Sequence, residues 1–143
     1  MTSSTHQRAV RLLLTMALAG SVLVVSSGTG SAALHSRKFQ TPSGNIGCLY
    51  DDGALRCDIE GELKPQPKRD CDFDWAAMEV EADGKARPLC ISDTVRDSDA
   101  PTLKAGRKWK RNGIVCRAKR VSLRCHNRKH HGFFLSRDDW DTF

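Results

Sequence analysis

The side chains best able to contact an anion are concentrated in one stretch of the chain. Residues 104–137 contain twelve lysines and arginines and no acidic residue, whereas residues 34–103 contain nine basic and fourteen acidic residues, a net charge of −5. Such a separation of charge is typical of a protein that meets a partner of opposite charge. We therefore expect the basic stretch to dock on an anionic surface polymer (wall teichoic acid, an acidic glycan, anionic lipid headgroups or nucleic acid) or on an acidic protein. The alternative is that the protein's own acidic half lies against it.

Two arginines of this stretch are expected to face each other. If the chain from Cys116 to Cys125 forms two paired strands, alternation of side chains puts Arg117 opposite Arg124, on the face away from the cysteines. Like charges opposed across a strand pair are unfavourable, so we expect an anion on that face. The candidate ligand-binding residues are the cations of this hairpin and of the segment before it: Arg107, Lys108, Lys110, Arg111, Arg117, Lys119, Arg120 and Arg124.

Trp109 lies among four of these cations, within residues 106–111. Its ring could stack on a sugar or a base while the neighbouring cations hold phosphates. Alternatively, Trp109 is a core residue of a strand whose lysines alternate to the solvent face. We favour the core position, because that is the more common situation for such a pattern.

Three histidines, His126, His130 and His131, cluster in the same half of the chain. A zinc site on two of them would need further ligands, and the nearby cysteine is expected to be oxidised, so no metal and no cofactor are predicted. As acid–base groups, His130 or His131 could be oriented by Asp138 or Asp139 in a small hydrolase. The chain has no Gly-x-Ser-x-Gly, His-Glu-x-x-His or phosphate-loop motif. We therefore expect binding rather than catalysis, with a small hydrolase and a secreted protein-binding or inhibitor module as the alternatives.

The cysteines predict a disulfide framework, because an even number in an exported chain is typical of one. They are Cys48, Cys57, Cys71, Cys90, Cys116 and Cys125. Formally about 15 pairings are possible, but a type I′ turn at Asp52-Gly53 would put Cys48 directly opposite Cys57. The pair would not be hydrogen-bonded, and its Cα atoms would lie about 4.5 Å apart, a separation that a disulfide accepts. Cys116 and Cys125 have the same spacing, which leaves Cys71 with Cys90.

The N-terminal segment predicts export. Arg8 and Arg11 precede an apolar run over residues 12–25, and Ser31-Ala32-Ala33 supplies small residues for cleavage, so residues 1–33 are interpreted as a signal peptide. The run is shorter than the roughly 20 residues of a membrane-spanning helix, so no span is expected after cleavage. Residues 34–143 would then form a single β-rich six-cysteine domain, which we expect to be monomeric and secreted, either extracellular or associated with the cell envelope.

Short segments between turn residues predict a mainly β domain of short antiparallel hairpins, stapled by disulfides. Beyond the first cysteine hairpin, strands are expected at about residues 107–109, 114–118, 121–126 and 132–136, with a polar loop over residues 92–105. A hairpin around Asp83-Gly84 would place Pro88 opposite Glu79, and residues 72–77 could form one helical turn. A longer loop is expected at Arg120-Val121, because neither residue suits a tight turn.

Several segments of the chain carry a resemblance to a known family: Phe39-Gln40-Thr41-Pro42-Ser43-Gly44-Asn45-Ile46-Gly47-Cys48, Arg56-Cys57-Asp58-Ile59, Cys90-Ile91-Ser92-Asp93-Thr94, Leu103 with Gly106, and Gly132-Phe133-Phe134-Leu135-Ser136-Arg137. The chain resembles small exported bacterial proteins classed as a domain of unknown function. The resemblance covers about residues 39–143 and all six cysteine positions, and it departs at Val121, where the family pattern usually has Gly. The family has no established activity, so the resemblance implies export and disulfides and nothing about chemistry.

Overall fold

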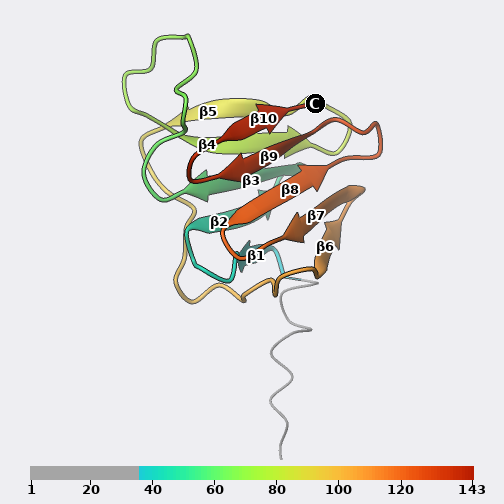
Figure 1. The fold of residues 1–143 in the computed structure, drawn as a ribbon. Helices are drawn as coiled ribbons and strands as arrows, with labels where there is room; N and C mark the ends of the chain where they lie inside the picture. Colours follow the sequence, from blue (N-terminus) through green and yellow to red (C-terminus); the bar gives the residue numbers. More distant parts are fainter. Residues whose placement is uncertain (1–35) are drawn as a thin grey trace, which may run out of the picture.

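The computed structural model describes residues 36–143 as ten strands in two five-stranded antiparallel sheets (Figure 1). In the order of hydrogen bonding, sheet A consists of β1 (Lys38–Gln40), β2 (Ile46–Asp51), β3 (Ala54–Ile59), β4 (Asp74–Glu81) and β5 (Arg87–Ile91). Sheet B consists of β10 (Trp140–Thr142), β9 (Gly132–Ser136), β8 (Ser122–His126), β7 (Ile114–Ala118) and β6 (Lys108–Arg111). The expected mainly β class is confirmed, and the expected signal peptide lies outside the described residues. The described part of the chain contains no helix, and therefore none long and apolar enough to cross a membrane.

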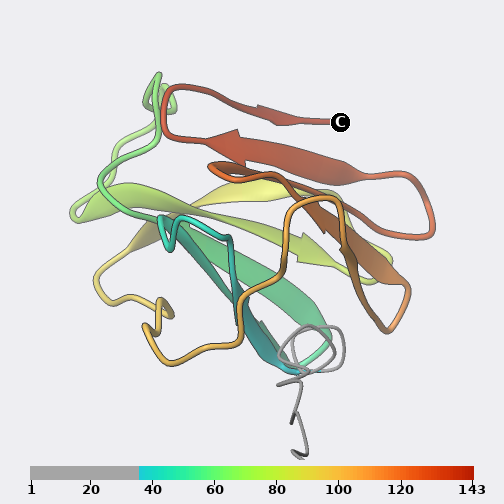
Figure 2. The same ribbon diagram turned by 60° about the horizontal axis from the view of Figure 1, so that its bottom comes forward.

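The two sheets face each other and share one hydrophobic core (Figures 1 and 2). At one end of the core, Phe39 of sheet A packs on Trp109 of sheet B, with ring centroids 5.0 Å apart. Leu55 and Phe133, from opposite sheets, are likewise fully buried. Because successive side chains of a strand point to opposite faces, the other half of the side chains of sheet B point away from this core.

The first cysteine hairpin has the predicted register. Cys48 lies opposite Cys57 and is bonded to it, with Cα atoms 4.1 Å apart. The turn residues Asp52 and Gly53 have φ angles of 44° and 83°, as a type I′ turn requires. Disulfides also join Cys71 to Cys90 and Cys116 to Cys125, so all three expected bonds are present.

The turn of the second cysteine hairpin is tighter than expected, so the prediction of a longer loop was wrong. Ala118 pairs with Leu123, and the backbone N–H of Lys119 donates to the carbonyl of Ser122 at 2.8 Å, which leaves only Arg120 and Val121 outside the pairing. Two contacts from sheet A hold this turn. The backbone N–H of Ser43 donates to the carbonyl of Arg120 at 3.1 Å, and Asn45 Nδ2 donates to the carbonyl of Val121 at 3.3 Å.

The hairpin of β4 and β5 exists, but its register differs from the prediction. Pro88 lies opposite Met78 rather than Glu79, and β4 already begins at Asp74, so the expected helical turn at residues 72–77 was also wrong. A β-bulge between Trp75 and Ala77 shifts the pairing within the hairpin. The connection spans residues 82–86 instead of a two-residue turn.

One buried side chain explains why this connection stays open. Asn127, only 1% exposed, follows β8 in sheet B, and its Nδ2 donates to the carbonyls of Glu81 at 2.9 Å and Gly84 at 2.6 Å in sheet A. Its Oδ1 accepts from the backbone N–H groups of Lys129 at 3.0 Å and His131 at 3.1 Å. Asn127 thus joins the two sheets and shapes the β8–β9 connection with the same amide.

The polar loop expected after β5 is confirmed, and an ionic cluster ties it to the outer face of sheet A. Asp58 is 1% exposed and accepts from Arg56 Nε at 2.8 Å and from the backbone N–H of Val95 at 2.8 Å. Arg56 also contacts Asp93 at 3.1 Å. Burial acts to lower the pKa of Arg56, but the hydrogen bonds and charges of the two carboxylates outweigh it and raise that pKa. The acidic half of the chain therefore uses part of its charge internally.

Candidate functional site

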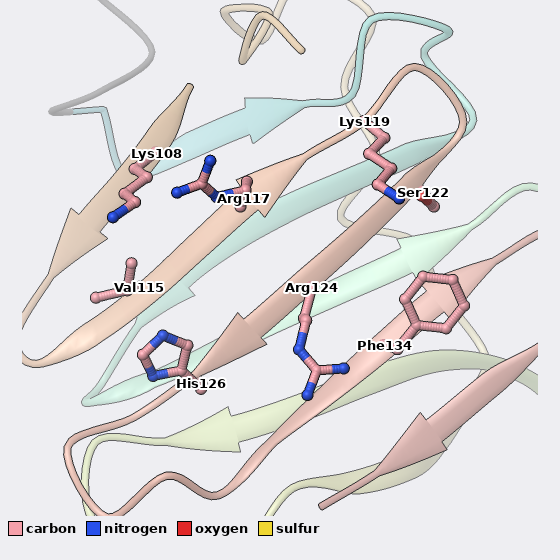
Figure 3. A pocket seen from close by; sticks show the side chains of 8 residues that line it. All are labelled: Lys108, Val115, Arg117, Lys119, Ser122, Arg124, His126 and Phe134. Carbon is pink, nitrogen blue, oxygen red and sulfur yellow. The ribbon is translucent and has the colours of Figure 1, made fainter. Parts of the chain in front are cut away.

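A basin of about 470 Å³ lies on the outer face of sheet B (Figure 3). It is formed by side chains of four neighbouring strands and the turn between two of them: Lys108, Val115, Arg117, Lys119, Ser122, Arg124, His126 and Phe134. Four of these eight residues are cations, and none is acidic. We call this feature the sheet B basin.

The strand register places the principal residues of the basin in one row across the sheet. Lys108 pairs with Arg117, Arg117 with Arg124, and Arg124 with Phe134. Figure 3 shows this order, from Lys108 at one side to Phe134 at the other. The predicted opposition of Arg117 and Arg124 is therefore confirmed, and the row also contains an aromatic ring.

Sequence reasoning missed three residues of the basin, although a signal for them was present. Val115 lies two positions before Arg117, and Ser122 lies two positions before Arg124, so the same alternation that orients the arginines also orients them. Phe134 follows only when β9 is paired with β8 in the observed register. The site therefore has apolar lining residues, Val115 and Phe134, in addition to the cations that the sequence predicted.

The basin cations have no carboxylate partner among residues 36–143. Several acidic residues of sheet A pair with arginines of that same half, for example Glu79 with Arg87 at 2.5 Å, in addition to the Arg56 cluster. Arg137 of the basic stretch contacts Glu60 at 3.9 Å, but it does not line the basin. Asp141 of β10 lies opposite Phe134 in the same row and is exposed, yet it too is outside the basin lining. Positive charge at the basin is therefore left without an ion-pairing partner in this part of the chain.

Arg124 is held in place by an aromatic ring beyond the strand. Its guanidinium lies over the ring of Phe143, 3.8 Å from the centroid, a cation–π contact that fixes the side chain without neutralising it. Phe143 exchanges two backbone hydrogen bonds with Gly132, of 2.8 and 3.0 Å. A Cβ atom on Gly132 would meet the carbonyl oxygen of Cys125 at 2.0 Å, so only glycine fits this approach.

The other four predicted ligand-binding residues lie outside the basin lining. Lys110 is exposed on the same face of β6, in register with Val115. Arg107 and Arg120 are exposed next to the strand ends. Arg111, one residue beyond Lys110, alternates away from the basin, and its guanidinium lies 5.5 Å from the ring centroid of Tyr50. The fold thus brings Lys108, Arg117, Lys119 and Arg124 together and leaves the remaining cations at the periphery or behind the sheet.

Trp109 is a core residue. It is fully buried, and its Nε1 donates to the carbonyl of Ser36 at 2.9 Å. Its ring is therefore inaccessible to a sugar or a base, and any stacking in this region depends on another aromatic side chain.

The histidines are divided between the basin and a turn. His126 lines the basin, and the exposed ring of His130 stacks on it with centroids 6.2 Å apart. His131 precedes β9 and Asp138 follows it, so at about 3.3 Å per residue roughly 20 Å separates them, too far for a hydrogen bond. No group of three or more side chains suited to hold a metal ion occurs within residues 36–143. Catalysis oriented by Asp138 or Asp139 is not supported by this arrangement.

Comparison with known proteins identifies a family. A model of a family of unknown function (DUF6636) matches residues 17–143, a range that includes all six cysteines and every residue of the basin. Searches of curated proteins and of solved structures found no similar protein. The match identifies a family and carries no information about a ligand.

Proposed function

The chain belongs to the family of unknown function DUF6636, and from its own geometry we propose that it is an exported binding protein that docks the sheet B basin on an anionic surface polymer. The observation that carries this proposal is the direct opposition of Arg117 and Arg124, neither of which forms an ion pair with a carboxylate among residues 36–143. Opposed like charges cost free energy in the folded protein. A bound anion would remove that cost, so the basin is suited to a ligand that brings negative charge.

A polymer fits better than a single small anion because the positive charge extends beyond the basin. Lys110, Arg107 and Arg120 are exposed around it, so successive anionic units could be contacted at once. Contacts of this kind act additively through released counterions and give an affinity that falls steeply with salt. The proposed ligand is therefore a chain of repeated negative charges.

The compartment is consistent with this role. Three disulfides and no free cysteine among the described residues indicate an oxidising environment. Together with the N-terminal segment interpreted as a signal peptide, this supports secretion to the cell surface, where anionic polymers are available to a basic face.

The test is retention of the producing cell's envelope polymers by the full-length oxidised protein at low and high salt. The test variant is the double substitution Arg117→Gln/Arg124→Gln. Its matched control is Lys68→Gln/Lys85→Gln, which removes the same charge from exposed positions in sheet A connections. We expect the wild type and the control to retain an anionic polymer at low salt only, and the test variant to lose most of it.

Equal retention by both double variants would contradict the proposal, because it would make net charge rather than the basin responsible. Salt-resistant capture of one protein would instead favour the second candidate, a protein-binding module. That candidate has its own structural support in the connection between β3 and β4. Trp140 Nε1 donates to the carbonyl of Pro65 at 2.6 Å, Trp75 Nε1 donates to that of Arg69 at 3.2 Å, and Phe73 of the same connection is 62% exposed. A preordered loop with an exposed apolar side chain suits contact with a protein.

A further inference from the structure

We propose that the polymer is a single-stranded nucleic acid, with one base stacked on Phe134 and the flanking phosphates held by the arginines and lysines of the basin. This inference rests on the proposed function and specifies its ligand. Single-strand binding sites combine a positively charged groove with aromatic rings that accept any base. The sheet B basin contains both parts in one row of the sheet.

The spacing of the cations suits consecutive phosphates. Neighbouring strands are about 4.8 Å apart, and alternate residues of one strand are about 6.7 Å apart. Lys108, Arg117 and Arg124 lie on three successive strands, so they cover roughly 10 Å across the sheet. Lys119 adds a fourth charge two residues along from Arg117. Two neighbouring phosphate groups can therefore be contacted together, rather than one isolated anion.

Phe134 occupies the position that a stacking ring needs. It is partly exposed, unlike its neighbours Phe133 and Leu135, which are buried in the core. It lies directly opposite Arg124, and Figure 3 shows its ring on the side of Arg124 away from Arg117. A nucleotide with its base on this ring would have its phosphate within reach of Arg124.

Arg124 is oriented for the same purpose. One face of its guanidinium lies on Phe143, which pairs with Gly132 at the start of the strand that carries Phe134, so the charged group is held over the sheet. Arginine planes and aromatic rings are the two kinds of side chain on which unstacked bases are commonly found. The guanidinium of Arg124 and the ring of Phe134 therefore provide two surfaces on which bases can stack.

The other lining residues are poorly suited to a ligand that is recognised through its hydroxyl groups. Apart from the cations and His126, the only polar side chain in the basin is Ser122, which is 8% exposed. A glycan or polyol phosphate offers many hydroxyls, and the lining supplies few neutral hydrogen-bonding side chains to meet them. The volume of about 470 Å³ lies within the range of pockets that enclose one small-molecule unit, here one nucleotide.

The test compares three polyanions by fluorescence anisotropy and competition, using the full-length oxidised protein. The probes are a labelled single-stranded oligonucleotide of mixed sequence, the corresponding duplex, and linear polyphosphate, which has charge and no bases. Duplex bases are already stacked on one another, so their faces cannot reach Phe134. We expect the single strand to bind most tightly, with a slope of log K against log salt of about −1.4 for two contacted phosphates.

Two variants separate stacking from charge. Phe134→Leu keeps an apolar side chain but removes the ring, and it should weaken single-strand binding at least about fivefold while leaving polyphosphate binding unchanged. Phe134→Tyr keeps the ring and should retain single-strand binding, which controls for disturbance of the fold. Arg117→Gln should weaken binding of both the oligonucleotide and polyphosphate and reduce the salt slope for the single strand by about 0.7.

The possible failures are distinguishable. If polyphosphate binds as tightly as the oligonucleotide per charge, or if Phe134→Leu has no selective effect, the nucleic-acid inference is overturned while docking on an anionic polymer stands. If none of the three polyanions binds at low salt, both the inference and the proposed polymer docking are overturned.

Discussion

Substitution of Arg117 by glutamate should stabilise the fold and abolish polymer binding at the same time. Arg117 lies opposite Arg124 in the pair next to the Cys116–Cys125 disulfide, whose Cα atoms are 4.1 Å apart. That short separation marks a non-hydrogen-bonded pair, so the arginines form a hydrogen-bonded pair with Cα atoms about 5.5 Å apart. The variant replaces a repulsion between two exposed charges by an attraction.

The size of the effect follows from this geometry. Like charges directly opposed across a strand pair are unfavourable, and measured cross-strand charge pairs contribute about 0.2–1 kcal/mol. Reversing one sign therefore raises the free energy of unfolding by about 0.5–1.5 kcal/mol, and the melting temperature by a few degrees in a domain of this size. At about 1 M salt the screening length falls to about 3 Å, so the gain should largely disappear.

Urea denaturation at low and at 1 M salt measures this change, and polymer retention is assayed on the same preparations. Lys110→Glu is the matched control: the same charge reversal on the same face, but opposite Val115 rather than an arginine. It should change stability little. A different outcome, with Arg117→Glu destabilised by more than about 1 kcal/mol and binding unchanged, would refute the reasoning, because it would mean that the basic face is neutralised within the protein itself.

Three further predictions concern the scaffold that positions the basin. Asn127→Ala removes four part-buried hydrogen bonds made by a buried side chain and should lower the free energy of unfolding by about 2–4 kcal/mol in denaturant titrations; a loss below about 1 kcal/mol would show that water replaces the amide. Asp58→Asn should lower the free energy of unfolding by about 1.5–3 kcal/mol and speed hydrogen exchange at the Val95 amide. Asp93→Asn, at the exposed end of the same cluster, should lower it by less than about 1 kcal/mol. Replacing Cys71 and Cys90 by alanine removes the disulfide that closes a loop with a sequence separation of 19, and it should lower the free energy of unfolding by about 3 kcal/mol. An unchanged melting temperature would contradict that value.

Local spacing was sufficient to predict the cysteine hairpins. Asp52-Gly53 defines a turn whose two residues have positive φ, and counting back along the strands places Cys48 against Cys57 without any knowledge of the rest of the fold. The same period of two places Arg117 opposite Arg124. These features depend on residues fewer than ten positions apart, so they could be predicted from the sequence with only turn geometry and side-chain alternation.

Contacts between segments that are distant in the sequence decided the features of the fold that local spacing could not predict. The tight turn at Arg120-Val121 has no glycine to favour it, but it is held by hydrogen bonds from Ser43 and Asn45. The register of β4 and β5 depends on a bulge and on Asn127, which comes from the other sheet. No local pattern contains that information.

The sheet B basin likewise depends partly on local sequence and partly on tertiary contacts. The sequence by itself determined that residues 104–137 are basic, that the disulfides fix two hairpins, and that two arginines oppose each other. Only the tertiary structure decided that Arg111 lies against Tyr50, that Phe134 lies in the row next to Arg124, and that the ring of Phe143 lies against that guanidinium. The physical reason is that charge and alternation are properties of a single strand, whereas a concave site depends on which strands pair and on where the carboxylates of the other sheet find their partners.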